Sequence, residues 1–193
     1  MRARLMALPL VLLLTALPLL LALASHRDVR DDNDVKGRLD LRKVSIYGRP
    51  RVWNIQTYDG WSSRSIWDRG YLLVHLDTLG GERFDYYALV SSDGRGMEGV
   101  LFRDRREKAD HRVAKLAAWR SSRRRVKVRI PFGKTKIEEG RGFFRWQLRT
   151  LFTGRGCRRS CIDFAPGAPV KEPLGQKAMG RVQASPTPSP SPS

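Results

Sequence analysis

The sequence predicts an all-β fold, an antiparallel β-sandwich of about eight strands with a jelly-roll topology. Apolar and polar residues alternate with a period of two in segment after segment, and turn-forming residues separate those segments. No stretch beyond the N-terminal segment shows the spacing of an amphipathic helix. A closed barrel is the alternative architecture.

The N-terminal segment has the features of an export signal. Arg2 and Arg4 precede an uncharged, leucine-rich stretch that ends in Ala22-Leu23-Ala24. Small residues at the first and third positions before the cut suit a signal peptidase, so we expect cleavage after Ala24. A retained membrane anchor is the alternative, because about twenty apolar residues are long enough to cross a bilayer. We expect a secreted protein that is extracellular or associated with a cell wall.

Three regions follow the expected cleavage point. Residues 25–36 form an acidic leader that we expect to be flexible, and residues 37–174 form the domain, which is long enough for one hydrophobic core. In residues 175–193, Pro alternates with Ser or Thr toward the C-terminus, a composition typical of a disordered tail.

Two strands carry the clearest alternation. In Arg125–Ile130 three β-branched residues alternate with three cationic ones, and in Phe143–Phe152 apolar residues alternate with Arg and Gln. The other expected strands cover residues 39–47, 52–58, 71–77, 84–91, 97–103 and 112–119. Glycines in Asp93-Gly94-Arg95-Gly96 predict a hairpin turn, and regular patterning fades after Cys161.

Positive charge accumulates in the second half of the chain. Lys and Arg number 37 against 19 acidic residues, a net charge of +18. Residues 25–110 hold 16 basic and 15 acidic side chains, whereas residues 111–193 hold 19 basic and 4 acidic ones. A segregated excess attracts polyanions. The predicted polyanion-binding residues are Arg125, Lys127, Arg129, Arg145, Arg149, Arg155, Arg158 and Arg159.

The partner expected from this charge is an anionic extracellular or cell-wall polymer. Export excludes intracellular nucleic acid, and cleavage would leave no membrane contact. A GC-rich genome is the alternative source of the charge, because 28 of the 37 basic residues are Arg. The oligomeric state is not predicted by the sequence.

The two cysteines, Cys157 and Cys161, are close in sequence and predict a disulfide in an exported protein. A redox or metal-binding pair and free thiols are the alternatives.

Two oxygen-rich segments are candidate calcium sites. One is the run Asp31-Asp32-Asn33-Asp34 with Asp40 behind it, and the other is the loop from Asp77 to Asp85 between two strands. Carboxylate and carbonyl oxygens are the ligands that calcium prefers. Asp77 and Asp85 are the predicted metal ligands, and no other cofactor is expected.

The loop that carries Trp61 and Trp67 suggests a second function. Exposed tryptophans beside polar groups can stack on sugar rings. With the Asp77–Asp85 loop they would make a calcium-dependent carbohydrate-binding module. Inward-facing tryptophans that cap the core are the alternative.

Catalysis has weaker support in the sequence. We find no serine on a glycine-flanked elbow and no cysteine paired with histidine, and we predict no catalytic residue. An extracellular hydrolase is the remaining alternative, with paired carboxylates drawn from Asp77, Asp85, Asp68 or Glu98.

Several short segments resemble, in their order, an uncharacterised group of secreted, arginine-rich bacterial proteins. The resemblance implies export and a β-sandwich, and it transfers no catalytic residue because the group has no assigned activity. Its carrying segments are Gly37-Arg38-Leu39-Asp40, Ile66-Trp67-Asp68-Arg69, Leu76-Asp77-Thr78, Phe84-Asp85-Tyr86-Tyr87, Arg145-Trp146, Thr150-Leu151-Phe152-Thr153, and Cys157 and Cys161 with Ala165-Pro166.

Overall fold

The computed structural model describes residues 27–48, 51–81, 83–105, 107–135, 143–157 and 159–173. The expected export signal, its cleavage point and the expected disordered tail lie outside these residues. In the described part of the chain, no helix is both long and apolar enough to span a bilayer.

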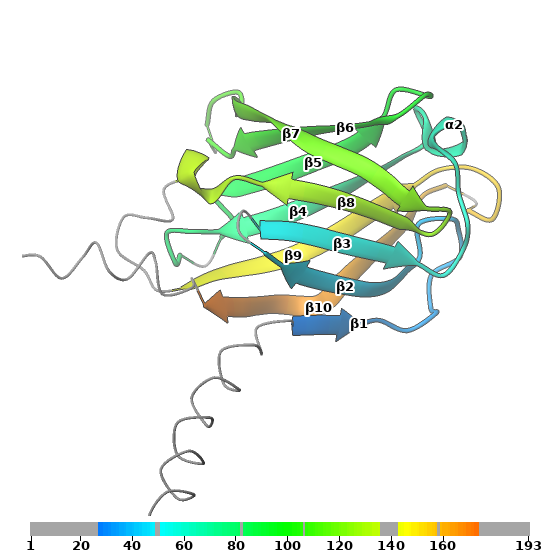
Figure 1. The fold of residues 1–193 in the computed structure, drawn as a ribbon, viewed down its shortest axis with the longest axis horizontal. Coiled ribbons are helices and arrows are strands. Elements are labelled where there is room, and N and C mark those ends of the chain that lie inside the picture. The colour runs from blue at the N-terminus through cyan, green and yellow to red at the C-terminus, as the bar shows by residue number, and fades with distance from the viewer. Residues whose placement is uncertain are drawn as a thin grey trace, which may run out of the picture.

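Within the described residues, ten antiparallel strands form one sheet (Figure 1). Two short helical segments, α2 (Ser63–Ile66) and η2 (Phe132–Lys134), lie in connections between strands. The strands in sheet order are β1 (Arg27–Arg30), β2 (Leu41–Tyr47), β3 (Arg51–Thr57), β8 (Arg125–Ile130), β7 (His111–Ser122), β6 (Met97–Arg103), β5 (Tyr86–Ser92), β4 (Gly70–Asp77), β9 (Phe143–Phe152) and β10 (Cys161–Pro173).

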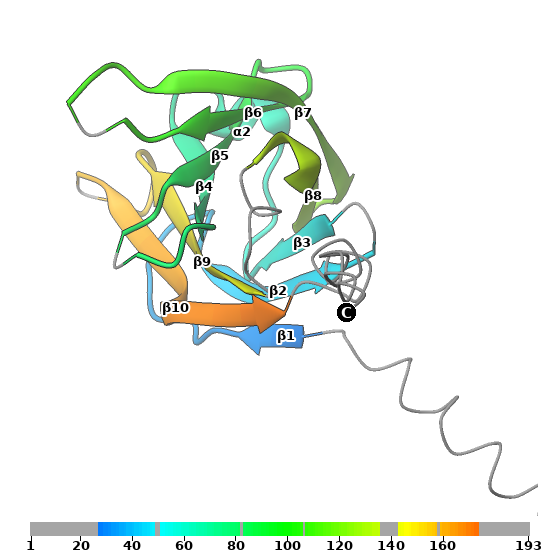
Figure 2. The same cartoon turned by 90° about the vertical axis from the view of Figure 1, so that its left-hand side faces the viewer.

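The sheet curls until its two edge strands meet. Viewed from the end, the strands surround a common interior, and β1 and β10 lie side by side (Figure 2). β10 also contacts β2. The structure is therefore all-β and antiparallel as predicted, but it is one nearly barrel-shaped sheet of ten strands rather than an eight-stranded sandwich. We call the line along which β10 meets β1 and β2 the seam.

The long strand β7 joins two parts of the sheet. Its first half, His111 to Leu116, pairs with β6, and its second half, Ala117 to Ser122, pairs with β8. We call β1, β2, β3, β8 and the second half of β7 the first sheet half. The first half of β7 with β6, β5, β4, β9 and β10 is the second sheet half.

The predicted alternation is confirmed in the two clearest strands. Val126, Val128 and Ile130 of β8 are fully buried, and the cations between them face outward. In β9 the buried side includes Phe144 and Trp146. Burial of such side chains is the main stabilising term of a domain this size.

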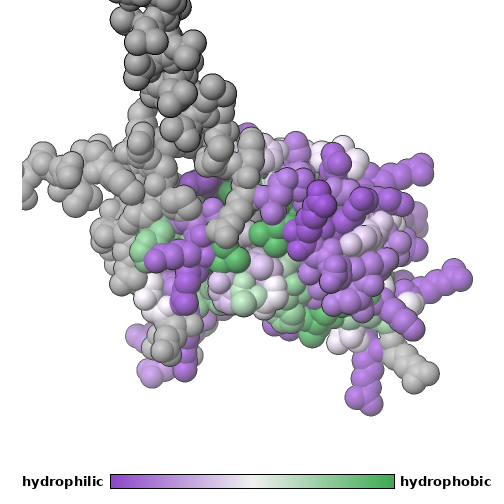
Figure 3. Space-filling model, turned by 90° about the horizontal axis from the view of Figure 1, so that it is seen from below, coloured by the Kyte–Doolittle hydropathy of each residue, from purple (hydrophilic) through white to green (hydrophobic). Residues whose placement is uncertain are grey.

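The eight predicted strands are all present, and the two edge strands were missed. Residues 27–30, expected in a flexible leader, form β1 and pair with β2. In β10 the usual pattern is inverted, because Asp163 and Ala165 face inward while Ile162 and Phe164 are 36% and 40% exposed. Figure 3 looks onto the seam side and shows apolar surface between hydrophilic regions.

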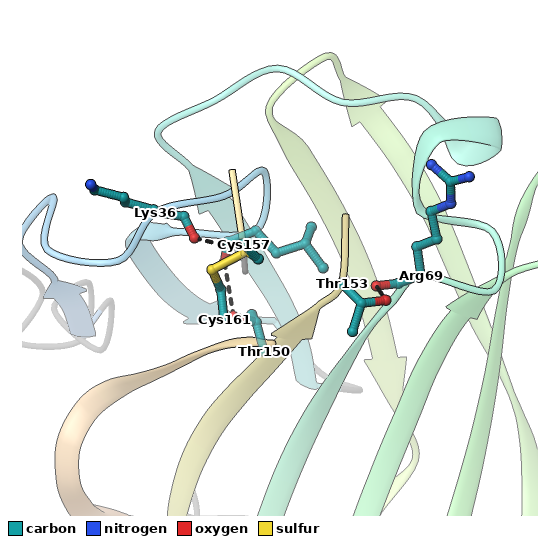
Figure 4. The surroundings of a disulfide bond; sticks show 7 residues. Lys36, Arg69, Thr150, Thr153, Cys157 and Cys161 are labelled. Atoms are coloured by element: carbon teal, nitrogen blue, oxygen red, sulfur yellow. Dashed lines mark hydrogen bonds between the residues drawn. A yellow bond between two sulfur atoms is a disulfide. The ribbon is translucent and has the colours of Figure 1, made fainter. Parts of the chain in front are cut away.

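A disulfide between Cys157 and Cys161 is confirmed, and it clips the connection from β9 to β10 (Figure 4). A Cβ atom at Gly37 would lie 2.9 Å from Cys157 Sγ, so the connection between β1 and β2 packs tightly against this clip. Thr150 Oγ1 also donates a hydrogen bond of 2.8 Å to the carbonyl of Leu39. The disulfide is compatible with an oxidising, extracellular location.

Candidate functional site

The eight predicted polyanion-binding residues do not gather on one side. β8 and β9 are separated by β7, β6, β5 and β4 in the sheet, so their outward side chains lie on different parts of the barrel. Arg155 and Arg159 are exposed in the connection between β9 and β10, and Arg158 lies outside the described residues. The single cationic sheet face expected from the later strands is therefore not formed.

The two arginines of β9 have partners at short range. Arg145 Nε donates a hydrogen bond of 2.7 Å to Asp77 Oδ2, and its guanidinium also reaches the carbonyl of Gly81. The guanidinium of Arg149 lies over the ring of Phe164, 5.6 Å from its centroid. These contacts use the two arginines to hold β9 to its neighbours.

The three cations of β8 occupy a different setting, on the outer side of the first sheet half. Three cross-strand rows run from β2 through β3 and β8 to β7. The rows are Lys43, Gln56, Arg125 and Ser122; Ser45, Asn54, Lys127 and Trp119; and Tyr47, Val52, Arg129 and Ala117. We call these three rows, together with Arg123 and Arg124 of the turn between β7 and β8, the basic face.

The basic face carries no negative charge on its strands. None of β2, β3, β8 and β7 contains an Asp or Glu. Lys43, at the border, pairs with Asp28 of β1 at 2.5 Å. Arg125, Lys127 and Arg129 have no carboxylate partner among the described residues, and their Cα atoms follow one another at about 7 Å.

Aromatic side chains lie among these cations. Lys127 Nζ is 5.6 Å from the ring centroid of Tyr47, and the guanidinium of Arg129 is 6.0 Å from that of Trp119. Trp119 is 37% exposed. The mixture of cations and aromatic rings offers both charge attraction and flat stacking surface to a ligand. Sequence reasoning missed Tyr47 and Trp119, although their outward positions in alternating strands were a usable signal.

The loop predicted to bind calcium through Asp77 and Asp85 is closed on itself. Asp85 accepts hydrogen bonds from the backbone of Thr78 at 2.9 Å and Leu79 at 3.0 Å, and from Thr78 Oγ1 at 2.7 Å. Asp77 accepts from Gly80 N and pairs with Arg145. Both carboxylates therefore stabilise the turn between β4 and β5.

The other acidic run meets a carboxylate from far along the chain. Oxygens of Asp34, Asp40 and Asp163 all lie within 4.8 Å of one another. Asp31 lies close to Asp163, and burial together with the charge of Asp163 raises the pKa of Asp31. We call these four residues the acidic seam, because Asp163 comes from β10 and the others come from the connection between β1 and β2. Asp163 was missed in the sequence because it stands in a segment without regular patterning.

Burial and mutual repulsion change the acidity of this group. Desolvation, followed by the charge of Asp163, raises the pKa of Asp31 to about 7. The same two causes raise the pKa of Asp40 to about 7. Burial also raises the pKa of Asp163. Near neutral pH the cluster therefore holds protons that ordinary aspartates would release.

The two loop tryptophans have different environments. Trp61 is buried under the guanidinium of Arg120, 4.7 Å from its ring centroid, and its Nε1 donates to Thr57 Oγ1. Trp67 is 51% exposed. It lines an open pocket together with Arg64, Asp93, Gly94 and Arg95.

The carboxylates considered for a hydrolase are spread between the two ends of the barrel. Asp68 and Glu98 lie at the end that carries α2, whereas Asp77 and Asp85 lie at the opposite end of β4. The length of an eight-residue strand, about 25 Å, separates the two ends. His75 is on the outer side of β4, where burial and the charge of Arg149 lower its pKa.

No family model, no curated protein and no solved structure matches this chain.

Proposed function

We propose that this protein is a secreted, non-catalytic binding module whose basic face contacts an anionic extracellular or cell-wall polymer. One observation carries the proposal. Four neighbouring strands without a single acidic residue present the outward cations of β8, which have no carboxylate partner among the described residues.

Counterion release supplies the driving force. A polymer with closely spaced negative charges condenses small cations around itself, and bound Lys and Arg side chains release them. Arginine adds paired N–H donors that fit phosphate and carboxylate groups. Binding should therefore be strong at low salt and weaken as the salt concentration rises.

The proposal is tested with fluorescein-labelled linear polyphosphate as the probe, by fluorescence anisotropy at low and moderate salt. The variant Arg125→Gln/Lys127→Gln/Arg129→Gln should bind at least tenfold more weakly than the wild type at 50 mM NaCl.

A control variant, Arg83→Gln/Arg105→Gln/Lys108→Gln, removes the same charge from exposed connections away from the basic face. It should bind nearly as well as the wild type. Equal losses in the two variants would show that net charge, rather than this face, attracts the polymer. No binding by the wild type at low salt would remove the proposal altogether.

A second candidate function is carbohydrate binding at the pocket of Trp67. The exposed indole is flanked there by Arg64 and Arg95, an arrangement that suits an acidic sugar stacked on the ring. Titration with oligogalacturonate, followed by tryptophan fluorescence, should give a saturating change that Trp67→Ala abolishes. The basic-face variant should leave this signal unchanged.

A further inference from the structure

We propose that the acidic seam binds one calcium ion, which joins the segment between β1 and β2 to β10. The site is separate from the basic face and does not depend on the proposed function. Its four carboxylates come from two segments that are more than 120 residues apart.

The first support is position. Asp31 directly follows β1, and Asp40 directly precedes β2. Asp163 reaches across from β10 and accepts a hydrogen bond of 2.6 Å from the backbone of Leu41. The cluster therefore lies where the edges of the sheet meet, and a ligand held by all its members would bridge the seam.

The second support is a buried oxygen without a partner. Asp40 is 3% exposed, and its Oδ1 has no hydrogen-bond partner among the described residues. Its carboxylate points into the cluster, since its oxygen is within 4.8 Å of those of Asp34 and Asp163. Oδ2 of Asp31 is also buried without a partner. An isolated buried carboxylate is costly unless a cation or hydrogen bonds compensate it.

The third support is the charge around the cluster. The carboxylates of Asp34, Asp40 and Asp163 lie within 4.8 Å of one another, where their negative charges repel. A bound divalent cation would replace this repulsion with attraction. The chain has a net charge of +18, so a group of four neighbouring carboxylates contrasts with its overall composition.

The donor set favours calcium over other ions. All four side chains offer hard oxygens, and calcium accepts six to eight such ligands in flexible geometry. Two ligands of one calcium ion lie at most about 5 Å apart, because each Ca–O distance is about 2.3–2.6 Å. The oxygens of Asp34, Asp40 and Asp163, all within 4.8 Å of one another, meet this condition. Zinc prefers thiolate and imidazole, and the nearby cysteines are joined in a disulfide.

The partners of Asp163 leave room for an ion. Its two oxygens accept hydrogen bonds from Leu41 N and Phe164 N, and each carboxylate oxygen has a second lone pair. The same aspartate can therefore anchor the start of β2 and ligate calcium. Water or backbone carbonyls would complete the coordination shell.

Calcium chloride alone is the test ligand, with the full secreted chain stripped of metal by a chelator. Isothermal titration at pH 8 should show one site per chain. If the dissociation constant is about 0.1–1 mM, as in extracellular calcium modules, 10 mM calcium should raise the Tm by roughly 3–10 °C. The same concentration of magnesium should raise it far less.

Three variants locate the site. Asp34→Asn removes an exposed ligand and should weaken calcium binding at least tenfold without harming the fold. Asp40→Asn should abolish binding and raise the Tm in chelator, because it removes a buried charge. Asp32→Asn is the matched control from the same acidic run, outside the cluster, and should bind like the wild type.

Several results would overturn the proposal. They are the absence of a saturable calcium signal in the wild type, an equal response to magnesium, and a loss in Asp32→Asn as large as that in Asp34→Asn. If Asp40→Asn does not fold, the comparison of Asp34→Asn with Asp32→Asn still decides the question. Polyphosphate binding measured on the same samples keeps this outcome distinct from that of the basic face.

Discussion

The stability of the calcium-free protein should fall as the pH rises from 5 to 8, and Asp40→Asn should suppress much of this fall. Asp40 is buried and its pKa is raised to about 7, whereas the unfolded chain releases the same proton near pH 4. The folded state therefore binds more protons in this interval. The stability that Asp40 contributes is complete below about pH 4 and is lost as the pH rises through 7.

The size of the effect follows from the interval between the two pKa values. Linkage over pH 5 to 8 for one such group gives a loss of about 3 kcal/mol, which corresponds to roughly 6–12 °C in Tm for a domain of this length. Asp31 adds to the loss, but it is less buried and its contribution is discounted for solvent screening. The lowered pKa of His75 acts in the opposite direction and is common to both proteins. The contribution of His75 therefore cancels when the stability of the variant is subtracted from that of the wild type.

Urea unfolding followed by tryptophan fluorescence, in chelator at several pH values, measures this difference. The wild type should lose about 3 kcal/mol more than Asp40→Asn between pH 5 and 8. Parallel profiles for the two proteins would refute the assignment of a buried, proton-binding carboxyl to Asp40.

Three further outcomes are expected. For polyphosphate binding, the slope of log K against log salt should become shallower by about 2 in Arg125→Gln/Lys127→Gln/Arg129→Gln, because three contacts to a single-stranded polyanion are lost. An unchanged slope would place the contacts elsewhere. Gly37→Ala should lower the free energy of unfolding, measured in urea, by about 1–3 kcal/mol, because Gly37 has a φ of +121° and a methyl group there would lie 2.9 Å from Cys157 Sγ. The control Gly167→Ala should leave the stability nearly unchanged, because nothing lies within 4 Å of the added atom. Phe144→Ala should lower the free energy of unfolding by about 3–5 kcal/mol because the Phe144 ring is fully buried. Phe143 faces outward, so Phe143→Ala should lower it much less, and equal losses would contradict the assignment of Phe144 to the inward face of β9.

The strands with strict alternation could be predicted from the sequence because burial imposes that alternation. Every second residue of β8 and β9 faces the interior, and all of these residues except Thr150 are apolar. The edge strands escaped prediction for a physical reason. β10 contains prolines and a glycine, which an edge strand tolerates, and it turns Asp163 inward between two exposed apolar residues.

The two candidate surfaces differ in how much the sequence revealed. The cations of β8 were predicted as a group, but their neighbours on the face come from β2, β3 and β7. Those contacts depend on the pairing of β3 with β8, which no local pattern specifies. The acidic run near residue 31 was visible, whereas its partner Asp163 could be found only once β10 was placed across the seam.

The shared strand β7 has a consequence for how the molecule unfolds. The first half of β7 forms hydrogen bonds with β6 and its second half with β8, so both sheet halves depend on this one strand. If either sheet half unfolds, β7 loses hydrogen-bond partners, and the other sheet half is destabilised. The described region should therefore lose its structure in one cooperative step, with fluorescence and circular dichroism tracing the same transition.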